Sequence, residues 1–178
     1  RSGTIRLLAG MQEGAVNVNG TLDASAPNGG DGGFIDTSAG RVRVQDTAKV
    51  TTLAASGRTG QWLIDPQDFV VGSGATDNIS GATLSALLVT NSVVIDTTAG
   101  ADVTVPGTPP VTNLHSGTVG NGDINVTEPV SWTAAPSTTT LTLNAARDVN
   151  VKLGADITAT NGNFVICCGR DINRSEER

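Results

Sequence analysis

One short phrase recurs three times in the last third of the chain: Asp123-Ile124-Asn125-Val126, Asp148-Val149-Asn150-Val151 and Asp171-Ile172-Asn173. The copies are spaced by 25 and then 23 residues. A period in the low twenties, carried by β-favouring residues and broken by Gly and Asn, is typical of a solenoid in which each repeat forms one coil. The sequence therefore predicts a rod-like stack of short parallel strands.

A second repeated segment predicts which side chains face the core. Leu141-Thr142-Leu143-Asn144-Ala145 aligns with Phe164-Val165-Ile166-Cys167-Cys168 at the same 23-residue step. Because strand side chains alternate between faces, the first, third and fifth residues of each segment are expected to point inward. In the recurring phrase the same alternation buries the apolar residues and places the following repeat positions on the solvent side: Asp123, Asn125, Asp148, Asn150, Asp171 and Asn173.

The first third of the chain carries the pattern in shorter segments. Three-residue strands, most with a polar middle residue, are expected at residues 5–7, 16–18, 22–24, 34–36, 42–44 and 48–50, nearly all separated by Gly, Asn, Asp or Ser. Short strands joined by tight corners favour a parallel β-helix over a sandwich of hairpins. With no Tyr, three Phe and two Trp among 178 residues, the core must consist of stacked Val, Ile, Leu and Ala. Trp62 and Trp132 are expected to be packing anchors.

The middle of the chain interrupts the repeat. Apolar residues at Leu84, Leu87 and Leu88 lie on one helical face behind Ser80, a candidate N-cap, which predicts a short helix over residues 80–89. A Thr-, Gly- and Pro-rich stretch over residues 97–122 is expected to form a long lateral loop or hairpin. The expected organisation is β-helix coils over residues 1–65, an inserted segment over 66–121, further coils over 122–173 and a polar tail over 174–178.

Charge and hydropathy exclude some functions. The net charge of −6 and the scattered basic residues argue against nucleic-acid binding, which needs clustered Lys and Arg. No apolar run approaches the length of a membrane span; the longest candidate covers residues 84–89. The chain begins at Arg1 without a signal peptide, so we expect it to be a piece of a longer polypeptide.

The candidate chemical groups favour a protein without catalytic, cofactor or metal sites. The aspartates of the repeat should stack about 4.8 Å apart, as a cation site, as a carboxylate pair or, in the favoured interpretation, as solvated corners whose repulsion Arg147 and Arg170 offset. His115 is the single histidine and lies in the Pro-rich loop, which disfavours a triad or a His-based metal site. Too few aromatic residues are available to line a sugar cleft.

The adjacent cysteines should face opposite sides of a strand. Cys168 is expected to point into the core and Cys167 to point outward. The favoured interpretation leaves both thiols free, while an intermolecular disulfide through Cys167 and a strained vicinal disulfide remain alternatives.

Two longer motifs carry a family resemblance. Gln61-Trp62-Leu63-Ile64-Asp65-Pro66 followed by Ile79-Ser80-Gly81-Ala82-Thr83-Leu84-Ser85 resembles filamentous-haemagglutinin-type large exoproteins, and the likeness spans about residues 3 to 173. The resemblance implies a bacterial protein exported by two-partner secretion that forms a right-handed parallel β-helix at the cell surface. The Asn-Pro-Asn motifs of that family's secretion module are missing, which places the segment in the stalk downstream of it.

The sequence thus predicts an all-β, right-handed parallel β-helix with one short helix and a lateral loop. The expected function is a non-enzymatic structural segment of a secreted bacterial adhesin, forming a stiff rod for adhesion or biofilm cohesion. Expected partners are a surface glycan or protein receptor and an outer-membrane two-partner secretion transporter, with end-to-end self-association as a further option. Alternatives are a self-assembling extracellular filament subunit and a carbohydrate-active β-helix enzyme.

Overall fold

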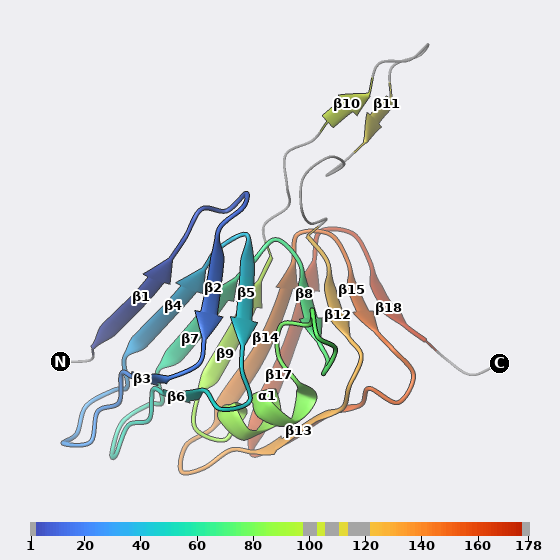
Figure 1. Ribbon diagram of the computed structural model, residues 1–178. Coiled ribbons are helices and arrows are strands. Elements are labelled where there is room, and N and C mark those ends of the chain that lie inside the picture. Colours follow the sequence, from blue (N-terminus) through green and yellow to red (C-terminus); the bar gives the residue numbers. More distant parts are fainter. Residues whose placement is uncertain (1–2, 98–102, 106–110, 114–121, 176–178) are drawn as a thin grey trace.

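The described part of the chain folds as a parallel β-solenoid, as the repeat predicts, with one short helix (Figure 1). The computed structural model describes residues 3–97, 103–105, 111–113 and 122–175. Most coils contribute a strand to each of three walls, and within each sheet of these walls the strands of successive coils pair in parallel. Within the described residues, no helix combines the length and hydropathy that a membrane span requires.

The first wall is a parallel sheet that runs through all the coils. Its strands, in spatial order, are β1 (Thr4–Leu8), β4 (Phe34–Ser38), β7 (Gln61–Asp65), β9 (Ser92–Asp96), β14 (Thr139–Ala145) and β17 (Gly162–Cys168). The register stacks Ile35, Trp62, Val93 and Leu141 in one inward column, and all four are buried. A continuous apolar column of this kind stabilises each coil through the coil beside it.

The predicted inward alternation is confirmed in this wall. Leu141, Leu143 and Ala145 on β14 are buried, and Phe164 on β17 pairs with Leu141 as the repeat predicts. Phe164 is nevertheless 38% exposed. Its exposure follows from the position of β17 at the edge of the sheet, where only one of its sides is paired.

The second wall consists of two separate parallel sheets. One pairs β2 (Ala15–Val18) with β5 (Arg41–Val44), and the other contains β8 (Phe69–Val71), β12 (Ile124–Val126), β15 (Val149–Val151) and β18 (Ile172–Arg174). Strands β5 and β8 belong to successive coils but are not paired with each other. The wall is therefore interrupted between the second and the third coil.

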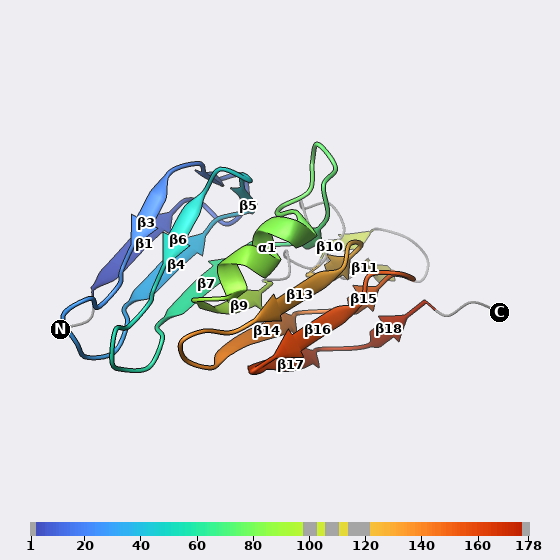
Figure 2. The same cartoon turned by 90° about the horizontal axis from the view of Figure 1, so that it is seen from below.

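The third wall contains the helix in place of one strand. Figure 2 shows α1 (Gly81–Leu88) lying between the pair β3 (Thr21–Asp23) and β6 (Lys49–Thr51) and the pair β13 (Val130–Thr133) and β16 (Ile157–Thr160). The helix buries Leu84, Leu87 and Leu88 toward the core. It is thus part of the wall.

The helix begins at carboxylates and hydroxyls supplied by three coils. Ser80 is the N-cap and accepts the Thr83 N–H at 3.2 Å, as predicted. Glu128, from the following coil, accepts the Gly81 N–H at 2.8 Å, and Asp46, from the preceding coil, accepts the Ser80 hydroxyl at 2.7 Å. Negative groups complement the partial positive charge of a helix N-terminus. These contacts fix the helix to both neighbouring coils.

The segment of residues 66–121 contains both solenoid strands and a lateral hairpin. It contains β8 and β9, which pair within the second and first walls, so the solenoid continues through much of it. The part that leaves the solenoid includes an antiparallel hairpin of β10 (Val103–Val105) and β11 (Val111–Asn113), which projects sideways in Figure 1. This pairing agrees with the predicted lateral hairpin over residues 97–122. Prediction of the helix over residues 80–89 is correct to within one residue at each end.

Candidate functional site

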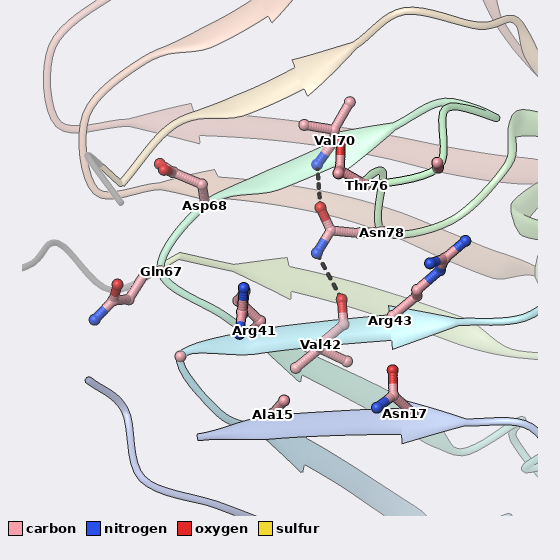
Figure 3. Close-up of a pocket in the computed structure, with 12 residues that line it drawn as sticks. Ala15, Asn17, Arg41, Val42, Arg43, Gln67, Asp68, Val70, Thr76 and Asn78 are labelled. Atoms are coloured by element: carbon pink, nitrogen blue, oxygen red, sulfur yellow. Dashed lines mark hydrogen bonds between the residues drawn. The ribbon is translucent and has the colours of Figure 1, made fainter. Parts of the chain in front are cut away.

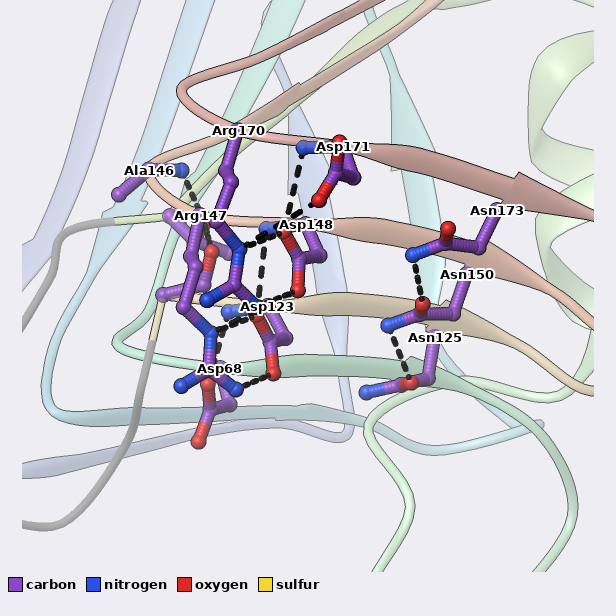
Figure 4. A network of polar contacts seen from close by, with 12 residues as sticks. Asp68, Asp123, Asn125, Ala146, Arg147, Asp148, Asn150, Arg170, Asp171 and Asn173 are labelled. Carbon is purple, nitrogen blue, oxygen red and sulfur yellow. Dashed lines mark hydrogen bonds and ion pairs between the residues drawn. The ribbon is translucent and has the colours of Figure 1, made fainter.

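The recurring aspartates lie together at the corner where the second wall begins. Asp123, Asp148 and Asp171 directly precede β12, β15 and β18, and Asp68 takes the same position before β8. Figure 4 shows these side chains stacked along the axis of the solenoid beside a parallel stack of asparagines. The sequence identifies three of the four aspartates, but it misses Asp68, because Asp68 precedes Phe-Val-Val and lacks the Asn of the repeated phrase.

Each aspartate at this corner binds the backbone of the next coil. The carboxylate of Asp68 accepts the Asp123 N–H at 2.9 Å. Asp123 in turn accepts the Asp148 N–H, and Asp148 accepts the Asp171 N–H, both at 3.2 Å. These bonds satisfy backbone donors at a point where the chain turns out of the sheet. We call this series of four residues the Asp ladder.

Two arginines complete the Asp ladder, and each binds the aspartate of the preceding coil. The Arg147 guanidinium donates through Nε to Asp123 at 2.7 Å and through Nη2 to its second oxygen. Arg170 forms the same forked contact with Asp148, with an Nε distance of 2.8 Å. A planar guanidinium matches a carboxylate in this bidentate geometry. Each arginine also lies near the aspartate that follows it, at 3.8 Å for Arg147 and Asp148.

The expectation that these aspartates are solvated is wrong for two of them. Asp123 is 9% exposed and Asp148 is 6% exposed. Burial is tolerated because each carboxylate receives a guanidinium and a backbone N–H from the next coil. Asp171 does lie at the surface, as predicted, with a side chain 64% exposed.

The electrostatics of the Asp ladder keep Asp148 ionised. The hydrogen bond from Arg170 lowers the pKa of the Asp148 carboxyl, burial opposes that effect, and the Asp171 N–H lowers the pKa further. The hydrogen bond from Arg147 to Asp123 raises the pKa of the Arg147 guanidinium. A carboxylate held in its charged form is a poor proton donor at neutral pH. The arrangement therefore suits structural ion pairing better than general acid catalysis.

The repeated asparagines form a second ladder on the outer face. The Asn150 side chain donates to the Asn125 carbonyl oxygen at 3.2 Å, and Asn173 donates to Asn150 at 2.9 Å. Asn150, in the middle, both donates and accepts along the stack, which is the pattern of the Asn ladders in stacked strands. The outward direction predicted for these residues agrees with their half-buried or exposed positions.

The remaining sequence-predicted residues lie apart from these ladders. Trp62 and Trp132 are buried, and their indole N–H groups donate to Thr37 and Thr139 at 3.1 and 3.0 Å. Cys167 is exposed and Cys168 half-buried, both as free thiols. His115 lies outside the described residues. Within the described ranges, no three His, Cys, Asp or Glu side chains are placed to hold a metal ion.

A groove that sequence reasoning misses lies where β5 and β8 part. It has a volume of about 460 Å³ and is lined by Arg41 and Arg43 on one side and by Gln67, Asp68 and Val70 on the other (Figure 3). The alternation of two arginines on one outer strand face was the available signal in the sequence. Their significance depends on the missing strand pair beside them, which no local pattern reveals.

Comparisons of the chain with protein-family models, with curated proteins and with solved structures found no match. The function is therefore inferred from the geometry of the solenoid and its surfaces.

Proposed function

We propose that the chain is a non-enzymatic structural segment of a secreted bacterial surface adhesin. In this role the solenoid is a stiff spacer that serves adhesion or biofilm cohesion. The observation that carries the proposal is the continuity of the first wall, whose parallel pairing passes from β1 to β17 through the coil that contains the helix. Strands perpendicular to the axis place a ladder of backbone hydrogen bonds along it, and such a ladder resists bending.

Two further features favour a structural role. The Asp ladder and the Asn ladder both connect side chains of successive coils along the axis. The carboxylates of Asp123 and Asp148 are occupied by arginines and backbone donors. Glycoside hydrolysis needs a pair of available carboxylates flanking the substrate. In the groove between β5 and β8 the described lining includes a single carboxylate, Asp68, which already binds the Asp123 N–H.

The proposal includes a route and a place of action. Export of the full protein would use an outer-membrane two-partner secretion transporter, and the receptor would be a surface glycan or protein. Side chains on the outer faces of a rigid solenoid, and loops that leave it, are free to vary without loss of the core. The solenoid would hold such groups at a fixed distance from the cell.

The adhesive role is tested with microspheres coated with the purified chain. The proposal predicts that these spheres attach to bacterial biofilm or to host cells more strongly than spheres coated with albumin. Equal attachment of the two would contradict the adhesive role. In the same preparation, release of reducing ends from polysaccharides would contradict the non-enzymatic role and favour a carbohydrate-active β-helix enzyme.

A self-assembling filament subunit is the second candidate. Of the large hydrophobic side chains exposed in the described residues, Phe164, Val165 and Ile172 lie on the edge strands β17 and β18, and Leu8 lies on the opposite edge strand β1. Unpaired strand edges with apolar side chains favour pairing with another chain. Sedimentation of the chain over a range of concentrations tests this candidate.

Ile172→Lys places a charge on one edge and should abolish concentration-dependent association. Leu153→Lys is the matched control, since Leu153 is equally exposed, at 58% against 54%, but lies outside the strands. A chain that stays monomeric at all concentrations, or two variants with equal effects, would contradict assembly through these edges.

A further inference from the structure

The geometry points to the groove between β5 and β8 as a binding site for a sugar acid, with the carboxylate on the two arginines and the hydroxyls on the opposite wall. This inference deepens the proposed function, because it names a ligand class for a surface segment. Its test measures binding alone, so its failure is distinguishable from failure of the structural role.

The groove exists because one asparagine separates two strands. The Asn78 side chain donates to the Val42 carbonyl on β5 and accepts the Val70 N–H on β8 at 2.5 and 2.7 Å (Figure 3). Its backbone carbonyl also accepts the Val44 N–H at 2.7 Å, and its N–H donates to the Val70 carbonyl at 3.0 Å. Four hydrogen bonds thus hold the strands apart. The gap is preformed, which lowers the cost of ordering a ligand there.

The wall formed by β5 is cationic. Arg41 and Arg43 are exposed on the same outer face of β5, since they are two residues apart on one strand. The β2 residues opposite them are Ala15, a small side chain that leaves room beside Arg41, and Asn17, an amide beside Arg43. Figure 3 shows all of these around the same opening.

Neither Arg41 nor Arg43 forms a close ion pair with a described carboxylate, although Arg43 lies near enough to Asp46 to help lower the pKa of that carboxyl. Ion pairs with aspartates occupy four arginines elsewhere in the solenoid: Arg6, Arg147, Arg170 and Arg174. In a chain of net charge −6, two neighbouring exposed guanidiniums on one strand face form a local site for an anion. Guanidiniums bind carboxylates with bidentate, charge-assisted hydrogen bonds.

The opposite wall offers hydrogen-bond acceptors. Asp68 lines it, and Gln67 closes one end with its amide N–H held by the Met11 carbonyl. The Gln67 side-chain oxygen is buried and has no partner among the described residues. Acceptors of this kind suit hydroxyl groups and repel a second anionic group.

Size and lining select the ligand class. A volume of about 460 Å³ lies in the range of small-molecule sites and is sufficient for one or two sugar rings. No aromatic side chain is among the described lining residues, so a neutral sugar would lack the stacking surface that it usually uses. A carboxylate on the ring supplies the missing affinity through Arg41 and Arg43. A sugar acid therefore fits better than a neutral sugar or a bare anion.

The test is a titration of the isotopically labelled 178-residue chain with galacturonate, followed by NMR. The inference predicts saturable shifts at Arg41, Arg43 and Gln67. Galactose, which has the same ring but no carboxylate, should cause no saturable shift there. Inorganic phosphate tests a bare anion and glycine tests a zwitterion, and both should bind more weakly than galacturonate.

Variants separate the site from general charge effects. The double variant Arg41→Gln, Arg43→Gln should weaken galacturonate binding by about tenfold or more, because it removes charge-assisted hydrogen bonds. Lys49→Gln removes a positive charge from an exposed position on β6 and should leave binding unchanged. Galactose, phosphate or glycine binding as tightly as galacturonate, the absence of a saturable shift with galacturonate, or equal losses in the double variant and Lys49→Gln would overturn the inference.

Discussion

At the scale of single residues, the solenoid depends on polar side chains that bind one coil to the next. Asn150 is the central member of the Asn ladder and contacts both Asn125 and Asn173. Asp148 has the same central place in the Asp ladder, between Arg147 and Arg170. The contacts of both residues recur from coil to coil, because each coil places the same side chain at the same position along the stack.

Asn150→Ala should lower the free energy of unfolding by about 1–2 kcal/mol, because it removes two side-chain hydrogen bonds. Urea denaturation provides the measurement. Asn163→Ala is the matched control, since Asn163 lies exposed on the edge strand β17 and should change stability little. Equal losses in the two variants would contradict a stabilising ladder.

Asp148 should also contribute to the pH dependence of stability. Its pKa is lowered in the folded protein, mainly by the hydrogen bond from Arg170. The folded state therefore binds fewer protons than the unfolded state, and the contribution of Asp148 is complete above its unfolded pKa of about 4. It is lost as the pH falls through the lower folded value.

Asp148→Asn should therefore destabilise the protein at neutral pH and flatten the fall in stability below about pH 4. Denaturation at a series of pH values measures both effects. Asp156→Asn is the control, because the Asp156 side chain is 74% exposed in its ion pair with Arg174. An unchanged acid limb in Asp148→Asn would contradict the account of this ion pair.

At the scale of elements, the helix-containing coil joins its neighbours through buried side chains. Asn91, just after α1, is fully buried. Its oxygen accepts the Thr52 N–H at 2.6 Å, and its amide donates to the Val50 and Leu87 carbonyls at 3.0 and 2.7 Å. One side chain thus connects the end of β6 to the C-terminus of the helix. It has the same role in the third wall as Asn78 in the second.

Asn91→Ala should lower the free energy of unfolding by about 3 kcal/mol, because it leaves several buried backbone groups without a partner. The loss of stability should exceed that of Asn163→Ala, which removes an exposed side-chain amide, when both variants are measured by urea denaturation. A loss below about 1 kcal/mol would show that the junction does not depend on Asn91.

At the scale of the whole molecule, the sequence predicts the repetition better than the junctions. The coils are predictable because inward positions must stay apolar in every turn, which the repeated Leu141 and Phe164 segments display. The burial of Asp123 is not predictable in the same way, since its partner Arg147 lies 24 residues later and meets it only through the register of the coils. The roles of Asn78 and Asn91 are not predictable for the same reason, since both residues lie outside the repeated phrases and meet their partners only through the packing of the coils.

Continuity through the helix-containing coil is the central structural claim, and amide hydrogen exchange tests it most directly. The account predicts strong protection for amides bonded between coils on both sides of α1, such as those of Gln61, Ile124 and Val149. Their exchange should reflect a common opening of the solenoid, with faster exchange at the edge strands β1 and β17. Two groups of amides that open independently, divided at β5 and α1, would contradict a single continuous solenoid.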